Sequence, residues 1–170
     1  YYTGLFSQRP RGAYGLENIL VDYFQLPAAV QQFQGQWLLL EKPDLTCLGR
    51  HGQLGIDAIA GDRVWDVQAK FRVRLGPLDR TQFEDFLPDR SPESSRKSLF
   101  LLAQLARLYV GPELDFDVQL VLAAADVPGT RLGGDGFGAR LGWNTWIAST
   151  AREYDADDAV FAPDENVWVN

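Results

Sequence analysis

The sequence has no methionine, one cysteine and one histidine among 170 residues. A lone Cys47 cannot form an internal disulfide, which fits a reducing compartment. A metal site needs three or four ligands, and Cys47 and His51 have only Glu41 and Asp44 as nearby carboxylates. The C-x-x-x-H spacing therefore favours an ordinary loop histidine over a metal site or a Cys–His nucleophile pair. No metal and no cofactor are predicted.

Long apolar runs are also missing. The longest stretch, Val118 to Ala125, is interrupted by Gln119 and falls far short of the roughly 18 residues that span a bilayer. We therefore expect a protein that is not inserted in a membrane. Because the chain starts at Tyr1 and has no methionine, we expect it to be a piece of a longer protein.

Excess positive charge is lacking too. The net charge is −7 and the pI is near 4.6, which argues against general nucleic-acid binding. What is present is apolar: 46% of the residues are hydrophobic, including five tryptophans and ten phenylalanines. That is enough to build a core for one domain, or for two small units that share a core.

Periodicity predicts alternating helices and strands. Apolar residues three and four apart predict a helix over 12–24 that Pro27 ends, and Asp79 with Gln82 marks the start of a short helix. A further helix follows residue 98 and closes at Gly111. Alternation predicts strands over 32–39, over 70–75 with Gly76-Pro77 ending it, over 114–122 and, in the acidic tail, over 159–161. This order predicts an α+β fold with small mixed or antiparallel sheets and helices packed on them.

The two halves of the chain carry similar sequence features in the same order. At a shift of about 85 residues the apolar positions of the two long helices match, Pro27 meets Pro112, and with a small gap Gly61-x-x-x-Trp65 meets Gly142-x-x-x-Trp146. We interpret this as an internal duplication of a helix–strand–loop–strand unit, with chance similarity as the alternative. The predicted organisation is a lead-in segment (1–11), a first α+β unit (12–78), a connecting helix with a polar linker (79–98) and a second α+β unit with an acidic tail (99–170).

Two charged rows have the period of a strand. Lys70, Arg72 and Arg74 lie on one face of their strand, and the row Glu113, Asp115 and Asp117 lies on one face of another, as solvated faces do. If the two strands pair, cross-strand ion pairs would contribute roughly 0.2–1 kcal/mol each. We predict that the rows face each other or a charged partner.

Other chemistry is weakly indicated. The glycines between Gly133 and Gly142 lack a Gly-Lys-Ser/Thr sequence and read as turns rather than a phosphate cradle. Carboxylates at Asp155, Asp157 and Asp158 leave a hydrolase as an alternative, and Trp143 with Trp146 leave a peptide- or glycan-binding module. The tryptophans that follow glycines, namely Trp65, Trp143 and Trp146, fit either core positions or exposed anchors for a protein partner.

Four separated segments carry a family resemblance. They are RPRGAYGLENILVDYF (9–24), RVWDVQAKFRVRLGPL (63–78), DFDVQLVL (115–122) and LGWNTWI (141–147). In this order they resemble the TssG family, also called ImpH or VasB, of type VI secretion baseplate subunits. Phe116 stands where the family's D-W-D-V-Q-L pattern has tryptophan, and the family's N-terminal portion is absent.

The resemblance implies a structural role without catalysis. Members of the family join TssF, TssK and TssE in wedges around the VgrG hub, in the cytoplasm at the inner-membrane secretion complex. No catalytic residue carries over. The candidates for partner binding are Lys70, Arg72, Arg74 and Trp143, while the repeat motif at Gly61, Trp65, Gly142 and Trp146 is predicted to be architectural.

Overall fold

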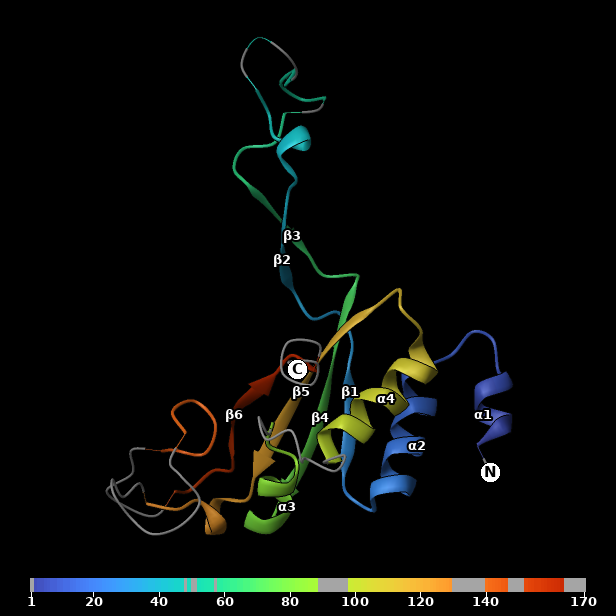
Figure 1. Cartoon of the computed structure of the whole chain (residues 1–170), viewed down its shortest axis with the longest axis vertical. Helices are drawn as coiled ribbons and strands as arrows, with labels where there is room; N and C mark the ends of the chain where they lie inside the picture. Colours follow the sequence, from blue (N-terminus) through green and yellow to red (C-terminus); the bar gives the residue numbers. More distant parts are fainter. Residues whose placement is uncertain are drawn as a thin grey trace.

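A mixed four-stranded sheet forms the body of the protein in the computed structural model (Figure 1). The structure describes residues 2–47, 49, 52–56, 58–88, 98–129, 140–146 and 152–163. The helices are α1 (Thr3–Ser7), α2 (Ala13–Phe24), α3 (Arg80–Asp85) and α4 (Ser98–Val110), with short 3-10 turns η1 (Lys42–Asp44) and η2 (Ala124–Asp126). The strands are β1 (Ala28–Gln31), β2 (Gln36–Leu39), β3 (Arg63–Asp66), β4 (Lys70–Leu78), β5 (Asp115–Leu122) and β6 (Ala156–Phe161).

The body sheet has the order β1-β4-β5-β6. Its central pair, β4 and β5, is parallel, and each outer strand runs antiparallel to its neighbour. A parallel pair needs a crossover between its strands, and here that crossover includes α3 and α4. The predicted α+β class with a mixed sheet is therefore confirmed.

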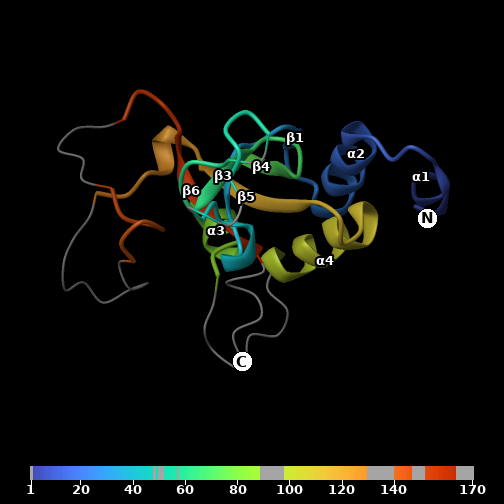
Figure 2. The same cartoon turned by 90° about the horizontal axis from the view of Figure 1, so that it is seen from above.

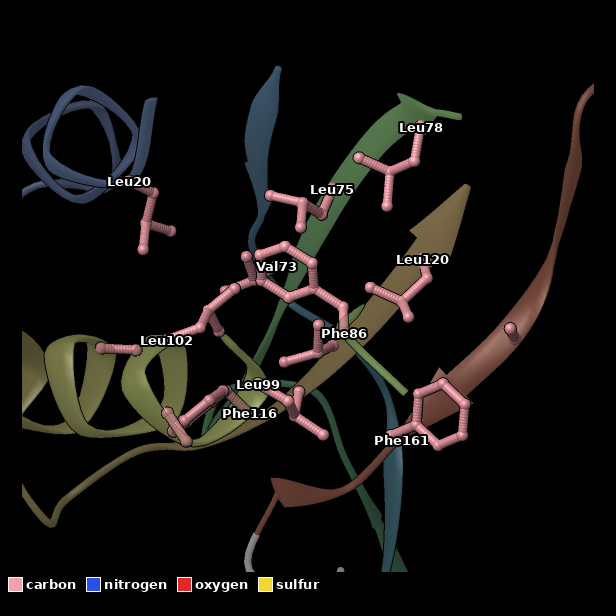
Figure 3. Close-up of a cluster of buried hydrophobic side chains, with 14 of the residues drawn as sticks. Leu20, Val73, Leu75, Leu78, Phe86, Leu99, Leu102, Phe116, Leu120 and Phe161 are labelled. Carbon is pink, nitrogen blue, oxygen red and sulfur yellow. The ribbon is translucent and has the colours of Figure 1, made fainter. Parts of the chain in front are cut away.

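The core lies between the sheet and its helices. Alternation places Phe71, Val73 and Leu75 of β4 on the face that α3 and α4 cover, and Figure 2 shows both helices on the same side of the sheet. Figure 3 shows leucines of α2 and α4 directed toward the same cluster as the side chains of β4, β5 and β6. Burial of this apolar surface is the main force that holds the body together.

The start of α3, the end of α4 and the strand in the tail were predicted correctly from the sequence. Asp79 and Gln82 form the predicted capping box of α3, because the Gln82 amide donates to Asp79 Oδ1 at 2.8 Å and the Asp79 amide donates to Gln82 Oε1 at 3.0 Å. Gly111 has a φ of +93°, as expected of the residue that closes α4. The strand in the tail also forms, over the longer range of β6.

Three expectations about the strands and helices were wrong. Of the strand predicted over 32–39, only residues 36–39 form one, as β2, because Phe33 adopts a φ of +60° that interrupts the extended backbone after β1 ends at Gln31. Gly76-Pro77 does not end β4, which continues to Leu78 across a shift in register. The helical period over 98–110 predicts Leu108 on the apolar face of α4, but Leu108 is 67% exposed, and the small Ala103 and Ala106 are buried instead.

The internal duplication is not confirmed. Each half contains a long helix and two antiparallel strands of the body sheet, namely β1 with β4 and β5 with β6. However, β4 and β5 are parallel while β1 and β4 are antiparallel, so the first strands of the two halves run in opposite directions. Residues 132–136 of the second half lie outside the described residues.

Candidate functional site

A two-stranded ribbon projects from the body (Figure 1). It is made of β2 and β3, paired antiparallel in the register Gln36 to Asp66 through Leu39 to Arg63, with the chain between them at its far end. We call residues 34–68 the arm. At its base the Gln34 amide donates to the Lys70 carbonyl at 2.9 Å, and Asp66 accepts the Ala69 amide at 3.0 Å. These two hydrogen bonds hold the base of the arm beside the first strand residues of the body.

The arm exposes large apolar side chains. Trp37 and Trp65 are 59% and 52% exposed, and Leu54 near the far end is 96% exposed. Other exposed apolar residues on the arm are Leu38, Leu39, Ile56, Ile59, Val64 and Val67. Single exposed apolar side chains are normal, but a concentration on one projection is typical of an interaction surface.

The two arm tryptophans form a built pair. Trp37 and Trp65 are direct cross-strand partners, and their rings meet edge to face with centroids 5.1 Å apart. Gly35 makes this arrangement possible, since a Cβ on Gly35 would lie 1.9 Å from the Trp65 ring. The two indoles are therefore held in position by contacts within the arm.

The charged rows of the sheet meet as predicted. β4 and β5 pair, and Asp117 receives Arg72 through bonds of 2.5 Å and 2.9 Å and Lys70 at 3.1 Å. Arg74 instead reaches Asp157 on β6 at 3.6 Å. The expectation that the whole acidic row is solvated was wrong, because Asp117 is only 3% exposed.

The ionisation of Asp117 depends on its two cations. Burial alone would raise the pKa of this carboxyl group, but the hydrogen bonds from Arg72 and Lys70 outweigh burial and hold the pKa below its ordinary value. The same hydrogen bonds, which Arg72 donates to Asp117, raise the pKa of the Arg72 guanidinium. The three side chains therefore form a charged cluster on the face of the sheet opposite the helices.

The tryptophans expected near the C-terminal glycines lie against the core. Trp143 is half-buried, with its ring edge to face with Phe161 and the guanidinium of Arg140 over it. Trp146 is 4% exposed and donates its indole N–H to the carboxylate of Asp158 at 2.8 Å. These positions do not favour a shared peptide- or glycan-binding surface.

The two glycine turns lead to different surroundings. Gly61 and Gly142 both have positive φ, at +107° and +77°. Trp65, four residues after Gly61, is exposed on the arm, whereas Trp146, four residues after Gly142, is buried in the core. Of the two tryptophans in the proposed repeat, only Trp146 is a core residue, and the exposed-anchor alternative fits Trp65.

The carboxylates of the hydrolase alternative have structural partners. Asp155 accepts the Ala124 amide at 2.9 Å, Asp157 pairs with Arg74, and Asp158 accepts the Trp146 indole. All three are exposed. Within the described part of the chain, no cluster of three potential metal ligands occurs. Cys47 is exposed, and His51 and the glycines at 133–139 lie outside the described residues.

Sequence reasoning missed the arm as a unit. The alternation over 32–39 predicts one strand of the ribbon, but no strand is predicted over residues 63–66 to pair with it. The missed signal is that tryptophans at 37 and 65 flank a long stretch rich in glycine and turn residues, as the two strands of a ribbon do. No helix in the described residues is long and apolar enough to cross a membrane.

Comparison with known proteins gives one family and two similar structures. A family model described as Type VI secretion, TssG matches residues 1–148. A chain of a TssK-TssF-TssG baseplate subcomplex from a type VI secretion system is similar with a TM-score of 0.68 at 20% identity, covering 93% of this chain and 65% of that one. A chain of a type VI secretion baseplate complex has a TM-score of 0.54 at 21% identity, with 94% and 43% covered. This chain thus spans less than two thirds of the length of either, and no curated protein matches it.

Proposed function

Since this chain belongs to the TssG family of type VI secretion proteins, we propose that it is a structural baseplate subunit that acts by binding partner subunits and not by catalysis. The similar solved structures are baseplate complexes, one of which holds TssK, TssF and TssG. Homologues of TssF and TssK are therefore the proposed direct partners. The family resemblance adds TssE and the VgrG hub as proposed further partners. It also suggests a cytoplasmic position at the inner-membrane secretion complex.

The observation that carries the proposal is the exposed tryptophan pair on the arm. An isolated two-stranded ribbon is marginally stable in water, because it has no further strand or helix against which to bury its side chains. The arm nevertheless exposes both indoles together with Leu38, Leu39 and Val64. Tryptophan is enriched among the residues that dominate binding energy at protein interfaces. We place the main partner contact on this arm.

The cations of β4 have a smaller role in this proposal. Lys70 and Arg72 are occupied by Asp117, so their contribution is first to the sheet. Arg74 is 37% exposed and its pairing with Asp157 is open to solvent, which leaves it available to a carboxylate of a partner. Trp143 is turned toward Phe161 and offers only part of its ring.

The test is co-purification with TssF and TssK homologues. Trp37→Ala and Trp65→Ala should each weaken the complex by roughly thirtyfold or more, the loss expected for a binding hot spot of about 2 kcal/mol. Tyr154→Ala is the matched control, because Tyr154 is an aromatic that is 80% exposed but lies away from the arm, beside β6. Full binding by the double tryptophan variant would rule out the arm as the main contact.

A further inference from the structure

Apolar side chains are exposed on both faces of the arm. Successive side chains of a strand point to opposite sides, and residues paired directly across two strands share a side. The pair Trp37 with Trp65 therefore lies on one face of the ribbon, and the pair Leu38 with Val64 lies on the other. All four side chains are exposed, those of Leu38 and Val64 by 43% and 39%. Both faces of the arm thus present apolar groups to water at these pairs.

The body sheet shows a different arrangement in the same chain. β4 also has a face that the described helices leave uncovered, and that face carries Lys70, Arg72 and Arg74. A sheet with one face in water usually alternates apolar and polar side chains in this way. The central pairs of β2 and β3 do not alternate, although the arm projects beyond the helices of the body (Figure 1). A ribbon that lies on a flat partner surface needs one apolar face, and the arm has two.

The two faces of the arm differ in size. Leu39 lies on the same side as the two indoles and is 74% exposed, so this tryptophan face is broad and mainly aromatic. Leu38 and Val64 form a smaller aliphatic face, which ends toward the body at the polar pair Gln36–Asp66. A partner that covers both faces must therefore offer a wide apolar wall to the tryptophan face and a narrower apolar wall to the aliphatic face.

We propose that the arm enters a cleft of the partner subunit with apolar walls on both sides, so that the partner covers the tryptophan face and the aliphatic face together. Removal of both faces from water is the driving force for this insertion. Packed sheet layers lie about 10 Å apart, so the backbones of the two walls would be about 20 Å apart. The inference rests on the proposed function, because the cleft belongs to the subunit that binds the arm.

Photo-crosslinking in the co-expressed complex with TssF and TssK homologues tests whether both faces are covered. p-Benzoylphenylalanine in place of Leu38 and, separately, of Leu39 puts the probe on opposite faces of the arm. Both positions should crosslink, and to different segments of the partner, while the exposed Tyr154 beside β6 is the control position and should give no product. A product at one position alone, the same partner segment at both, or a product that joins two copies of this chain overturns the cleft. If neither position crosslinks, the arm proposal fails as well.

Threonine variants measure the contribution of the aliphatic face. Leu38→Thr combined with Val64→Thr should weaken the complex roughly tenfold, because covered methyl groups give way to hydroxyls while the strand preference is kept. Val160→Thr is the matched control, since Val160 is a strand valine on β6 that is also 39% exposed, and it should leave binding unchanged. The exciton-coupled circular dichroism of the two indoles should persist in the double variant, which would show an intact ribbon. If the double variant binds as tightly as Val160→Thr while the tryptophan variants bind weakly, the cleft inference fails and the arm proposal stands.

Discussion

Arg72 of β4 and Asp117 of β5 lie directly opposite each other in the parallel central pair of the body sheet, joined by two hydrogen bonds of 2.5 and 2.9 Å. Lys70 adds a third contact to the same carboxylate at 3.1 Å. The cluster sits on the face that the described helices leave uncovered, where it joins two strands that are 45 residues apart in the chain. It therefore helps to hold the two halves of the protein in one sheet.

Asp117→Asn should destabilise the protein by about 2 kcal/mol, because two half-buried cations lose their carboxylate. The exposed Asp115→Asn, whose carboxylate lies 3.4 Å from Gln36 Nε2, should change the free energy of unfolding by less than about 0.5 kcal/mol. Urea unfolding of the two variants beside the unchanged protein measures both values. Equal stabilities of the two variants would show that the cluster contributes little.

Acid should remove the contribution of Asp117. Its pKa is lower in the folded than in the unfolded chain, so the stabilisation is complete above the ordinary aspartate pKa of about 3.9 and is lost as the pH falls through the lower folded value. The difference in unfolding free energy between the unchanged protein and Asp117→Asn should narrow in that acidic range. A difference that stays constant from neutral to acidic pH would disprove this role.

Gly76→Ala should destabilise the fold by about 3 kcal/mol. Gly76 has a φ of +126°, and an added Cβ would lie 2.5 Å from the Val121 carbonyl oxygen of the neighbouring strand. Gly129→Ala is the control, because nothing lies within 4 Å of an added Cβ there and φ is not positive. Thermal unfolding of the pair checks the prediction, which fails if the two variants melt together.

Gly35→Ala should disturb the arm without affecting the body. The new methyl group displaces the Trp65 ring, so the exciton-coupled circular dichroism of the two indoles should weaken. The free energy of unfolding should change by no more than about 0.5 kcal/mol, since the core residues are elsewhere. An unchanged indole signal would mean that Gly35 does not position the pair.

Much of the body follows from local patterns in the sequence. The amphipathic period of α2, the capping box of α3 and the glycine after α4 each depend on residues close in the chain, so they could be located without a structure. The opposite charges at Lys70–Arg74 and Asp115–Asp117 also indicated a strand pair. That pair formed because both strands have the same period and complementary side chains on one face.

The candidate site was only partly predictable. The prediction that the cations of β4 meet the acidic row was confirmed for Lys70 and Arg72, but the burial of Asp117 depends on which strand lies beside β4. The arm was not predicted, because Trp37 and Trp65 meet only through the pairing of β2 with β3, and these strands are far apart in the chain. Whether a tryptophan is a core residue or an anchor depends on what packs against it, and the same Gly-x-x-x-Trp spacing leads to both outcomes here.

The sequence by itself determined the family, the α+β class and most helix ends, because these depend on local order and on motifs along the chain. Only the tertiary structure decided that β4 and β5 are parallel, that Gly76-Pro77 lies within a strand, and that the arm leaves the body with its tryptophans exposed. These features arise from contacts between residues far apart in the chain. The net stability of such contacts depends on the surfaces they bury, which local sequence patterns do not record.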